Sequence, residues 1–174
     1  PVVLYCLYQA FAVLKYSIPE VAAWFIVGLA AWTAAEYFLH RFVFHFKPWG
    51  PRSENIHFLI HGVHHDYPMD SKRLVMPPAM SIPLASLFYF AFALVLDSHV
   101  MPMFAGFITG YLGYDMTHYA IHHFNFYSPF WLSVKNYHIK HHFLDPSRGF
   151  GVSSPVWDYL LHTNFMIKRK GEKI

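Results

Sequence analysis

Two short segments of this 174-residue chain repeat the same arrangement of histidines, and the chain has fourteen histidines in all. The segments are "HGVHH" at residues 61–65 and "HIKHH" at residues 138–142. Each places a histidine, two spacer residues and a pair of histidines in a row. Positions three and four apart lie on one side of a helical turn, so each segment predicts a set of three imidazoles facing the same way.

Two further histidine segments stand at the ends of long apolar stretches. "EYFLHRFVFH" places His40 and His45 five residues apart, a separation of about 140° around an α-helix. "YDMTHYAIHH" places His118 and His122 four residues apart, on one helical face, with His123 directly after them. Residues at these spacings can approach a bound ion from different directions.

Metal binding is the chemistry that this histidine pattern favours. Burying about ten imidazoles without partners would cost a few kcal/mol each, so we expect a ligand that compensates. Neutral imidazole is the commonest side-chain ligand of metal ions. Zinc usually takes four ligands and other transition metals at most about six, so ten imidazoles match two ions. The spacing does not distinguish zinc, which has no redox chemistry, from iron, which can pass electrons to dioxygen.

Few other residues offer comparable chemistry. Cys6 is the single cysteine of this sequence, so it has no partner here for a disulfide or for a thiolate metal site. Acidic residues beside the histidine segments are expected either to accept hydrogen bonds from ligand N–H groups or to serve as helix caps and ion pairs; they are Glu36, Asp66, Asp115 and Asp145. The histidines interpreted as ordinary polar residues are His57, His99, His123 and His162.

The elements that must position these histidines are apolar. The chain is 55% hydrophobic, 20% aromatic and only 13% charged, a composition typical of proteins that reside in lipid. Crossing a hydrocarbon core of about 30 Å takes about 20 helical residues. Four apolar stretches stand out, at residues 2–16, 21–46, 79–96 and 101–124. The second and fourth are long enough to cross the membrane, and the first and third are near the lower limit of length.

Short connections join these stretches in pairs. "SIPE" at 17–20 and "DSHVMP" at 97–102 indicate two helical hairpins, which leave the histidine-bearing segments 47–78 and 125–174 on one side. Twelve of the thirteen lysines and arginines lie in those segments or at the helix ends that adjoin them, and Lys15 is the exception. Positive charge marks the cytoplasmic face of a membrane protein. We therefore predict one all-α domain over residues 1–174, with a four-helix membrane anchor and a cytosolic helical cap that holds a dinuclear metal site. In the alternative arrangement, the first and third stretches are buried or re-entrant helices.

The four histidine segments together resemble the fatty acid hydroxylase and sterol desaturase superfamily of membrane di-iron oxygenases. Within it, "EYFLHRFVFH", "HGVHHDYPMDSKRLVMPP", "GYDMTHYAIHH" and "YHIKHHFLDPSRGFGVSSPVWD" are similar to the fatty acid 2-hydroxylases. The resemblance extends from about Glu36 to His162. It implies an iron-dependent monooxygenase that uses O2 to hydroxylate carbon 2 of a long-chain fatty acyl group, either free or in a sphingolipid such as ceramide.

The same resemblance implies a set of site residues. It implies two iron ions, for which zinc can substitute, and no catalytic side chains beyond the metal ligands. The implied ligands are His40, His45, His61, His64, His65, His118, His122, His138, His141 and His142.

The resemblance also implies partners and a location. Electrons would come from cytochrome b5 and its reductase, and because no haem-binding "HPGG" occurs in this chain, we expect the cytochrome b5 domain to be absent from it. The protein would be a multi-pass integral membrane protein, in the endoplasmic reticulum membrane if the source is eukaryotic, with the metal site facing the cytosol.

Three other functions would require different features of the sequence. A sterol methyl oxidase or desaturase of the same superfamily would share every ligand and differ in its substrate slot. A histidine-rich zinc transporter or metal store would place ionisable ligands near mid-membrane, whereas these histidines gather at helix ends on one side. Nucleic acid is not an expected partner, because the positive charge is modest and is sorted by membrane side.

Overall fold

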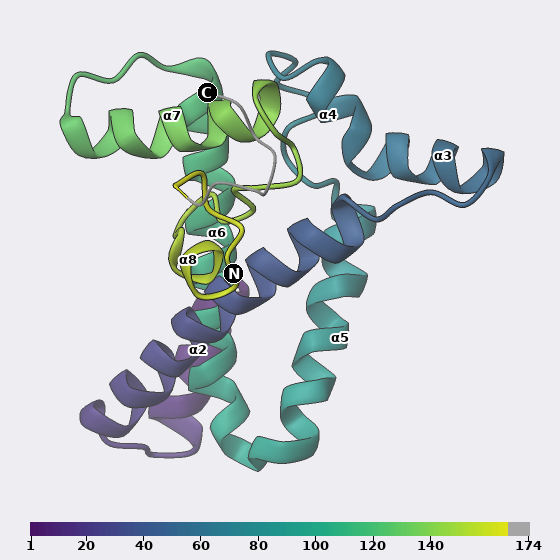
Figure 1. The fold of residues 1–174 in the computed structure, drawn as a ribbon. Coiled ribbons are helices and arrows are strands. Elements are labelled where there is room, and N and C mark those ends of the chain that lie inside the picture. Colours follow the sequence, from purple (N-terminus) through teal and green to yellow (C-terminus); the bar gives the residue numbers. More distant parts are fainter. Residues whose placement is uncertain (167–174) are drawn as a thin grey trace. The chain divides into compact units, whose positions relative to one another are not determined.

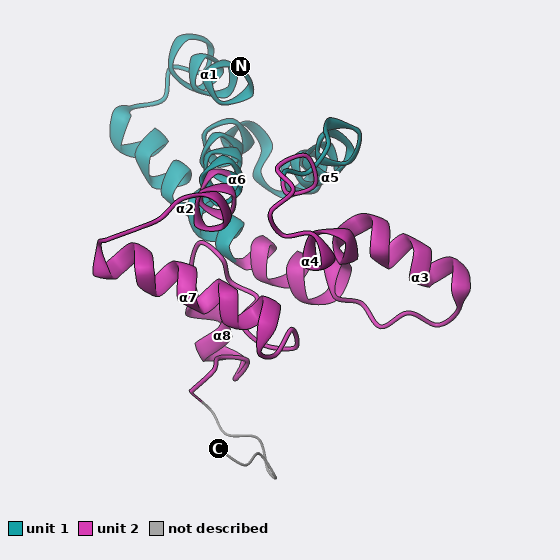
Figure 2. Ribbon diagram, turned by 90° about the horizontal axis from the view of Figure 1, so that it is seen from above, with its two compact units in different colours: residues 1–33, 75–115 teal, residues 34–74, 116–174 magenta. Residues whose placement is uncertain are grey.

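The computed structural model describes residues 1–166, and every regular element in that range is a helix (Figure 1). The prediction of an all-α protein is therefore confirmed. Four basic residues of the charge argument lie outside the described residues: Lys168, Arg169, Lys170 and Lys173. The chain forms two compact units, coloured separately in Figure 2; unit 1 contains Pro1–Thr33 and Val75–Asp115, and unit 2 contains Ala34–Leu74 and the described part of Met116–Ile174.

Unit 1 consists of apolar helices. Helix α1 (Val2–Tyr8) continues into a π-helical segment, Gln9–Val13. Helix α2 (Ile18–Phe38) begins in this unit, and α5 (Pro78–Leu96) and α6 (Val100–His123) follow after a long interval of sequence. A short 3₁₀ segment, Asp97–His99, connects α5 and α6, which run antiparallel (Figure 1). Asp97 has a positive φ, 47°, at this reversal, a conformation that is uncommon for residues other than glycine.

Glycines allow α2 and α6 to pack closely within unit 1. A Cβ atom added to Gly28 would lie 1.9 Å from the carbonyl oxygen of Met103, and one added to Gly106 would lie 2.0 Å from that of Phe25. Either contact is far inside van der Waals range, so both positions need glycine. Close backbone approach at small residues is the usual way in which helices associate in lipid.

Helix α5 exposes an apolar surface. None of its residues is buried within the protein, and Leu94 and Val95 are 88% and 82% exposed. Two helical runs, Ile18–Phe44 and Pro78–His123, are long and apolar enough to cross a membrane by length and composition; the second contains both α5 and α6. Apolar surfaces of this extent are typical of regions that contact lipid or another protein, because water solvates them poorly.

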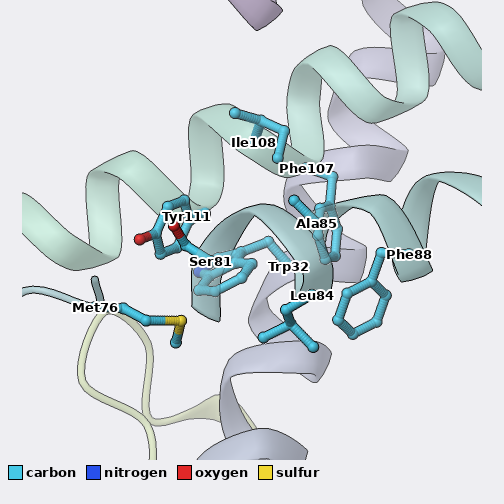
Figure 3. A pocket seen from close by; sticks show the side chains of 9 residues that line it. All are labelled: Trp32, Met76, Ser81, Leu84, Ala85, Phe88, Phe107, Ile108 and Tyr111. Carbon is cyan, nitrogen blue, oxygen red and sulfur yellow. The ribbon is translucent and has the colours of Figure 1, made fainter. Parts of the chain in front are cut away.

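A small cavity lies within unit 1, between aromatic side chains of α2, α5 and α6 (Figure 3). Its volume is about 20 Å³, room for about one water molecule. Trp32, Phe88, Phe107 and Tyr111 form much of its wall, and the indole N–H of Trp32 has no acceptor among the described residues. A cavity of this size does not accommodate an acyl chain.

Unit 2 contains shorter helices and all four histidine segments. It takes the end of α2, which passes into a π-helical segment, Leu39–Phe44, and the end of α6. The other elements of unit 2 are α3 (Pro51–His57), the π-helical segment Phe58–Gly62, α4 (Val63–Asp66), α7 (Pro129–Phe143) and α8 (Val156–Leu160). π-Helical turns are rare and often occur at functional sites, and two of those here carry histidines.

Candidate metal centre

The structure gathers the ten predicted ligands into two groups of five within unit 2. In each group the nitrogen atoms available to an ion all lie within 4.8 Å of one another. Group 1 contains His40, His45, His61, His65 and His141. Group 2 contains His64, His118, His122, His138 and His142.

Both HxxHH segments contribute to both groups. His61 and His65, four residues apart, belong to group 1, while His64 belongs to group 2. The later segment is divided in the same way, because His138 and His142 belong to group 2 and His141 to group 1. The sequence prediction had each segment presenting three imidazoles to one side. The structure separates the i, i+4 pair from the third residue because adjacent positions on a helix point about 100° apart.

A π-helical turn brings His40 and His45 together. The backbone N–H of His45 donates to the carbonyl oxygen of His40 at 3.0 Å, which is the i to i+5 pattern of a π-helix. The wider turn reduces the angular separation that an α-helix would give these two residues, and their ring centroids lie 5.0 Å apart. His61 likewise lies in a π-helical segment, Phe58–Gly62. Group 1 therefore depends on local deviations from α-helical geometry.

Helix ends supply most of group 2. His118 and His122 project from the last turns of α6, and His138 and His142 from the last turns of α7. Both pairs have the i, i+4 spacing that places side chains on one face of an α-helix. Only His64, from α4, joins these two pairs from a different element.

The nitrogen separations within the groups fit metal ions better than hydrogen bonds. His138 Nε2 lies 2.9 Å from His118 Nε2, and 3.0 Å from the Nε2 atoms of both His122 and His142. A neutral imidazole has a single N–H, so hydrogen bonding cannot account for three such contacts at one nitrogen. Nitrogens bound about 2.1 Å from one ion would be about 3.0 Å apart at right angles and about 3.4 Å apart in a tetrahedron. The observed spacing and the five nitrogens per group thus suit an ion with more than four ligands.

Group 1 shows the same close spacing. His61 Nε2 lies 3.1 Å from the Nε2 atoms of His40 and His65, and His141 Nε2 lies 3.0 Å from His45 Nε2. Backbone carbonyls hold the outer nitrogens of two of these rings. His40 Nδ1–H donates to the carbonyl oxygen of Phe150, and His141 Nδ1–H donates to that of Arg148, each at 2.6 Å. Because a carbonyl only accepts, the proton resides on Nδ1 and the Nε2 lone pair faces the group.

The surroundings keep the imidazoles neutral. Burial, and then the proximity of other imidazoles, lowers the pKa of His64 and of His65 to about 3. Burial also lowers the pKa of His141 to about 4. At neutral pH these rings carry no positive charge, and the neutral ring is the form that binds a metal ion.

Glu36 takes neither of its two predicted roles, a hydrogen bond to a ligand N–H or a helix cap or ion pair, among the described residues. Its buried carboxylate accepts hydrogen bonds from the backbone N–H groups of Val152 and Ser153, at 2.5 and 2.7 Å, and from the Ser153 hydroxyl. It therefore holds the backbone after α7 and not a histidine N–H. Sequence analysis also missed Asp158, a fully buried acid of α8 that binds the same stretch of backbone. The sequence signal for Asp158 is its position at the end of "YHIKHHFLDPSRGFGVSSPVWD", the stretch that begins with the last histidine segment.

A cavity of about 650 Å³ opens beside His45 of group 1. It combines two cationic side chains with aromatic rings, and its lining is Arg41, Phe42, His45, Phe46, Lys47, Pro146, Ser147 and Phe150. Arg41 is half-buried, and its Nη1 donates to the Tyr37 hydroxyl at 2.6 Å. The polar end of a ligand could therefore approach group 1 from this side.

The four histidines interpreted as ordinary polar residues lie outside both groups. His99, in unit 1, stacks on Tyr16 with ring centroids 5.0 Å apart, and its Nε2 lies 3.3 Å from a carboxylate oxygen of Glu20. His123 packs against Tyr119, and His57 against Phe46. These contacts are ordinary packing and polar contacts of single histidines.

Comparison with known proteins agrees with this site. Residues 25–163 match the family model described as fatty acid hydroxylase. This chain belongs to the fatty acid hydroxylase family. The match includes all ten histidines of groups 1 and 2. The resemblance inferred from the histidine segments is thereby confirmed.

Several relatives in the fatty acid hydroxylase family are similar to the chain. It is 40% identical over 164 residues to dihydroceramide fatty acyl 2-hydroxylase FAH1 of Arabidopsis thaliana, covering 94% of this chain and 69% of that protein. It is 46% identical over 144 residues to the ceramide very long chain fatty acid hydroxylase SCS7 of Saccharomyces cerevisiae, covering 80% of this chain and 37% of that protein. The chain likewise spans 38% of the length of rat fatty acid 2-hydroxylase, at 42% identity over 148 residues and 80% of this chain.

A solved structure of a family member has the same fold. It is described as full-length scs7p with only the hydroxylase domain visible, and it superposes with a TM-score of 0.87 at 40% sequence identity. The match covers 95% of this chain and 63% of that chain. The fold described above is thus that of a fatty acid hydroxylase domain.

Proposed function

We propose that this protein is a fatty acid 2-hydroxylase, a monooxygenase that converts the C–H bond at carbon 2 of a long-chain fatty acyl group into C–OH. One oxygen atom of O2 enters the product, and the other leaves as water after two electrons and two protons are supplied. The observation that carries this proposal is the pair of five-histidine groups within one unit of a fatty acid hydroxylase. The names of the relatives, which specify fatty acyl 2-hydroxylation, support the same reaction.

The ten histidines of groups 1 and 2 are the proposed ligands of two metal ions. Iron is the proposed metal, because when bound it would supply the electron transfer to dioxygen that zinc, which can occupy the same nitrogens, does not. The protein holds the rings neutral and directs their Nε2 atoms inward. For His40 and His141 the backbone carbonyls of Phe150 and Arg148 provide this orientation. Replacing C–H by C–OH is a two-electron oxidation that an acid or base side chain cannot supply, so no further catalytic side chain is proposed.

The cavity beside His45 is the proposed binding site for the polar end of the acyl group. Carbon 2 is adjacent to the acyl carbonyl, so a substrate oxidised there must place its polar end close to the metal site. The cavity supplies Arg41 and Lys47 for a carboxylate or carbonyl oxygen, and the rings of Phe42 and Phe150 for the first methylene groups. Because relatives are named for dihydroceramide and ceramide, the proposed substrates include amide-linked acyl chains as well as free acids.

The remaining proposals concern the setting of the enzyme. We propose that residues 1–174 form a single hydroxylase domain with a four-helix anchor that crosses the membrane several times, in the endoplasmic reticulum if the source is eukaryotic. The exposed apolar surface of α5 and the two long apolar runs support membrane insertion. The metal site would face the cytosol, where cytochrome b5 and its reductase would deliver the electrons. The lysine and arginine distribution supports that orientation.

The test compares the wild-type protein with His141→Ala and with a matched control, His57→Ala, which changes a histidine outside both groups. Each is expressed in cells without an endogenous 2-hydroxylase, and 2-hydroxylated lipids are quantified by mass spectrometry. Metal content is measured on the purified proteins. We expect two ions per chain and 2-hydroxy acyl products from wild type and His57→Ala, and loss of product from His141→Ala.

Other outcomes would contradict the proposal in different ways. Equal product from His141→Ala and wild type would show that the ligand assignment is wrong. Oxidised sterols in place of 2-hydroxy acids, after cells are fed both lipid classes, would indicate a sterol oxidase. Zinc as the sole metal, with no lipid product under reducing, oxygenated conditions, would indicate a metal store or transporter.

A further inference from the structure

The backbone between α7 and α8 determines how two rings of group 1 are oriented. Arg148 and Phe150 supply the carbonyl oxygens that accept from His141 Nδ1–H and His40 Nδ1–H. Both residues are buried, and Gly149 between them has a φ of 71°, a conformation that L side chains rarely adopt. The two carbonyls can thus serve both histidines only while this short segment keeps its unusual conformation.

Asp158 holds this segment from α8. Its carboxylate is fully buried, and its two oxygens accept from consecutive backbone N–H groups, Oδ1 from Phe150 at 2.9 Å and Oδ2 from Gly151 at 2.8 Å. Thr163 Oγ1 also donates to Oδ1, at 2.7 Å. Both backbone polar groups of Phe150 are therefore hydrogen-bonded: its N–H donates to Asp158, and its carbonyl oxygen accepts from His40.

Group 2 has no corresponding support from this segment. The Nδ1 atoms of His64, His138 and His142 are buried and have no hydrogen-bond partner among the described residues. Neither carbonyl of the segment therefore accepts a hydrogen bond from these nitrogens. A change in the conformation of residues 148–151 should consequently disturb group 1 and leave group 2 in place.

We propose that Asp158 is a positioning residue for the group 1 metal site, acting through the backbone carbonyls that fix the tautomers of His40 and His141. This inference rests on the proposed function, because it assumes that both groups bind metal. Groups that orient ligand histidines typically contribute about 10- to 100-fold to metal affinity. Asn at position 158 would keep the size of the side chain, but its amide nitrogen cannot accept the second backbone N–H.

The experiment measures release of metal from the purified full chain, loaded with Co²⁺ as the probe, during titration with a chelator. His61→Ala and His118→Ala identify which release step belongs to group 1 and which to group 2. For Asp158→Asn we expect the group 1 step to move to about 10- to 100-fold lower chelator concentration, with a change in the visible Co²⁺ spectrum, and the group 2 step to stay unchanged. Asp70→Asn is the matched control, because it makes the same change at a carboxylate that accepts from Lys72 and Arg73 and not from the segment after α7, and it should release both ions as wild type does.

Two results would overturn the inference while leaving the proposed function standing. In the first, Asp158→Asn retains both wild-type release steps and the wild-type spectrum. In the second, both steps shift together with a lower unfolding temperature, which would indicate a general structural role for Asp158. Wild-type protein that binds no Co²⁺ would instead refute the proposed metal function itself, and the inference with it.

Discussion

Groups 1 and 2 contain the same number of histidines but are built in different ways. Group 2 takes two i, i+4 pairs from the ends of regular helices α6 and α7. Group 1 takes histidines from two π-helical segments and relies on backbone carbonyls of an irregular segment to orient His40 and His141. Helical periodicity alone therefore aligns two pairs of histidines in group 2, whereas group 1 needs π-helical turns and tertiary contacts to reach the same nitrogen spacing.

The surroundings of the two groups differ as well. Group 1 adjoins the cavity that contains Arg41 and Lys47, whereas no described residue accepts from the outer nitrogens of His64, His138 and His142 in group 2. Group 1 is thus the side on which we place the polar end of the substrate. Three changes to the protein would test the contrast between the two groups.

The largest effect is expected at the centre of group 2. His138 Nε2 is within 3.0 Å of three other Nε2 atoms, so His138→Ala removes the nitrogen nearest to most of its group. We expect loss of the group 2 ion, with metal affinity reduced by more than about 100-fold, and no detectable 2-hydroxy product. Metal analysis and mass spectrometry check this. A variant that keeps both ions and full activity would show that group 2 is not a metal site.

An intermediate effect, larger at group 1 than at group 2, is expected at Gly149. An alanine there would adopt a positive φ, and its Cβ would lie 2.5 Å from the Phe165 ring. We expect Gly149→Ala to lower the free energy of unfolding by about 1–3 kcal/mol and to weaken metal binding at group 1 more than at group 2. Chemical denaturation and chelator titration measure the two effects.

Gly113→Ala is the control for the change at Gly149. Gly113 lies in α6, and a Cβ added to it meets nothing within 4 Å. Alanine should be tolerated there, with an unfolding free energy equal to or slightly above that of wild type. Equal weakening of both groups in Gly149→Ala would mean that the segment after α7 does not serve group 1 in particular.

The smallest effect is expected at the cavity beside His45. Lys47 is exposed, so its interaction with a substrate anion is screened by solvent and should contribute at most a few-fold to binding. We expect Lys47→Ala to raise KM for a free fatty acid by about 2- to 5-fold, with kcat unchanged, and to leave KM for a ceramide unchanged. Steady-state kinetics with both substrates, at two salt concentrations, measure this. The same increase in KM for the two substrates would exclude a selective role for the lysine charge.

Most of the fold class could be predicted because its signals are local. The long apolar stretches predict helices, and α2, α5 and α6 do follow three of them. The close approach of α2 and α6 at Gly28 and Gly106 could not be predicted, because a glycine in an apolar helix does not reveal which backbone it faces.

The residues of the candidate site could be predicted from the sequence, but their division into two groups could not. Composition and spacing singled out the histidine segments, and the resemblance they carried gave the ten residues that the structure brings together. The division of each HxxHH segment between two groups did not follow from spacing, since it depends on which neighbouring helix faces each side. Glu36 is far in the sequence from the backbone that it binds after α7, and an irregular turn separates Asp158 from that backbone. No local sequence pattern predicts either set of hydrogen bonds.

Residue types and spacing are enough to predict that this protein is helical, apolar and rich in histidines placed at helix ends, because hydrophobic periodicity and residue spacing act over a few turns. Tertiary contacts are needed to form the two groups of five histidines, to place His40 and His45 in one of them, and to let a buried aspartate support that group through the backbone. A metal site requires several nitrogens to meet at one point. Helix geometry can align two residues of one helix, but only packing between helices can bring five together.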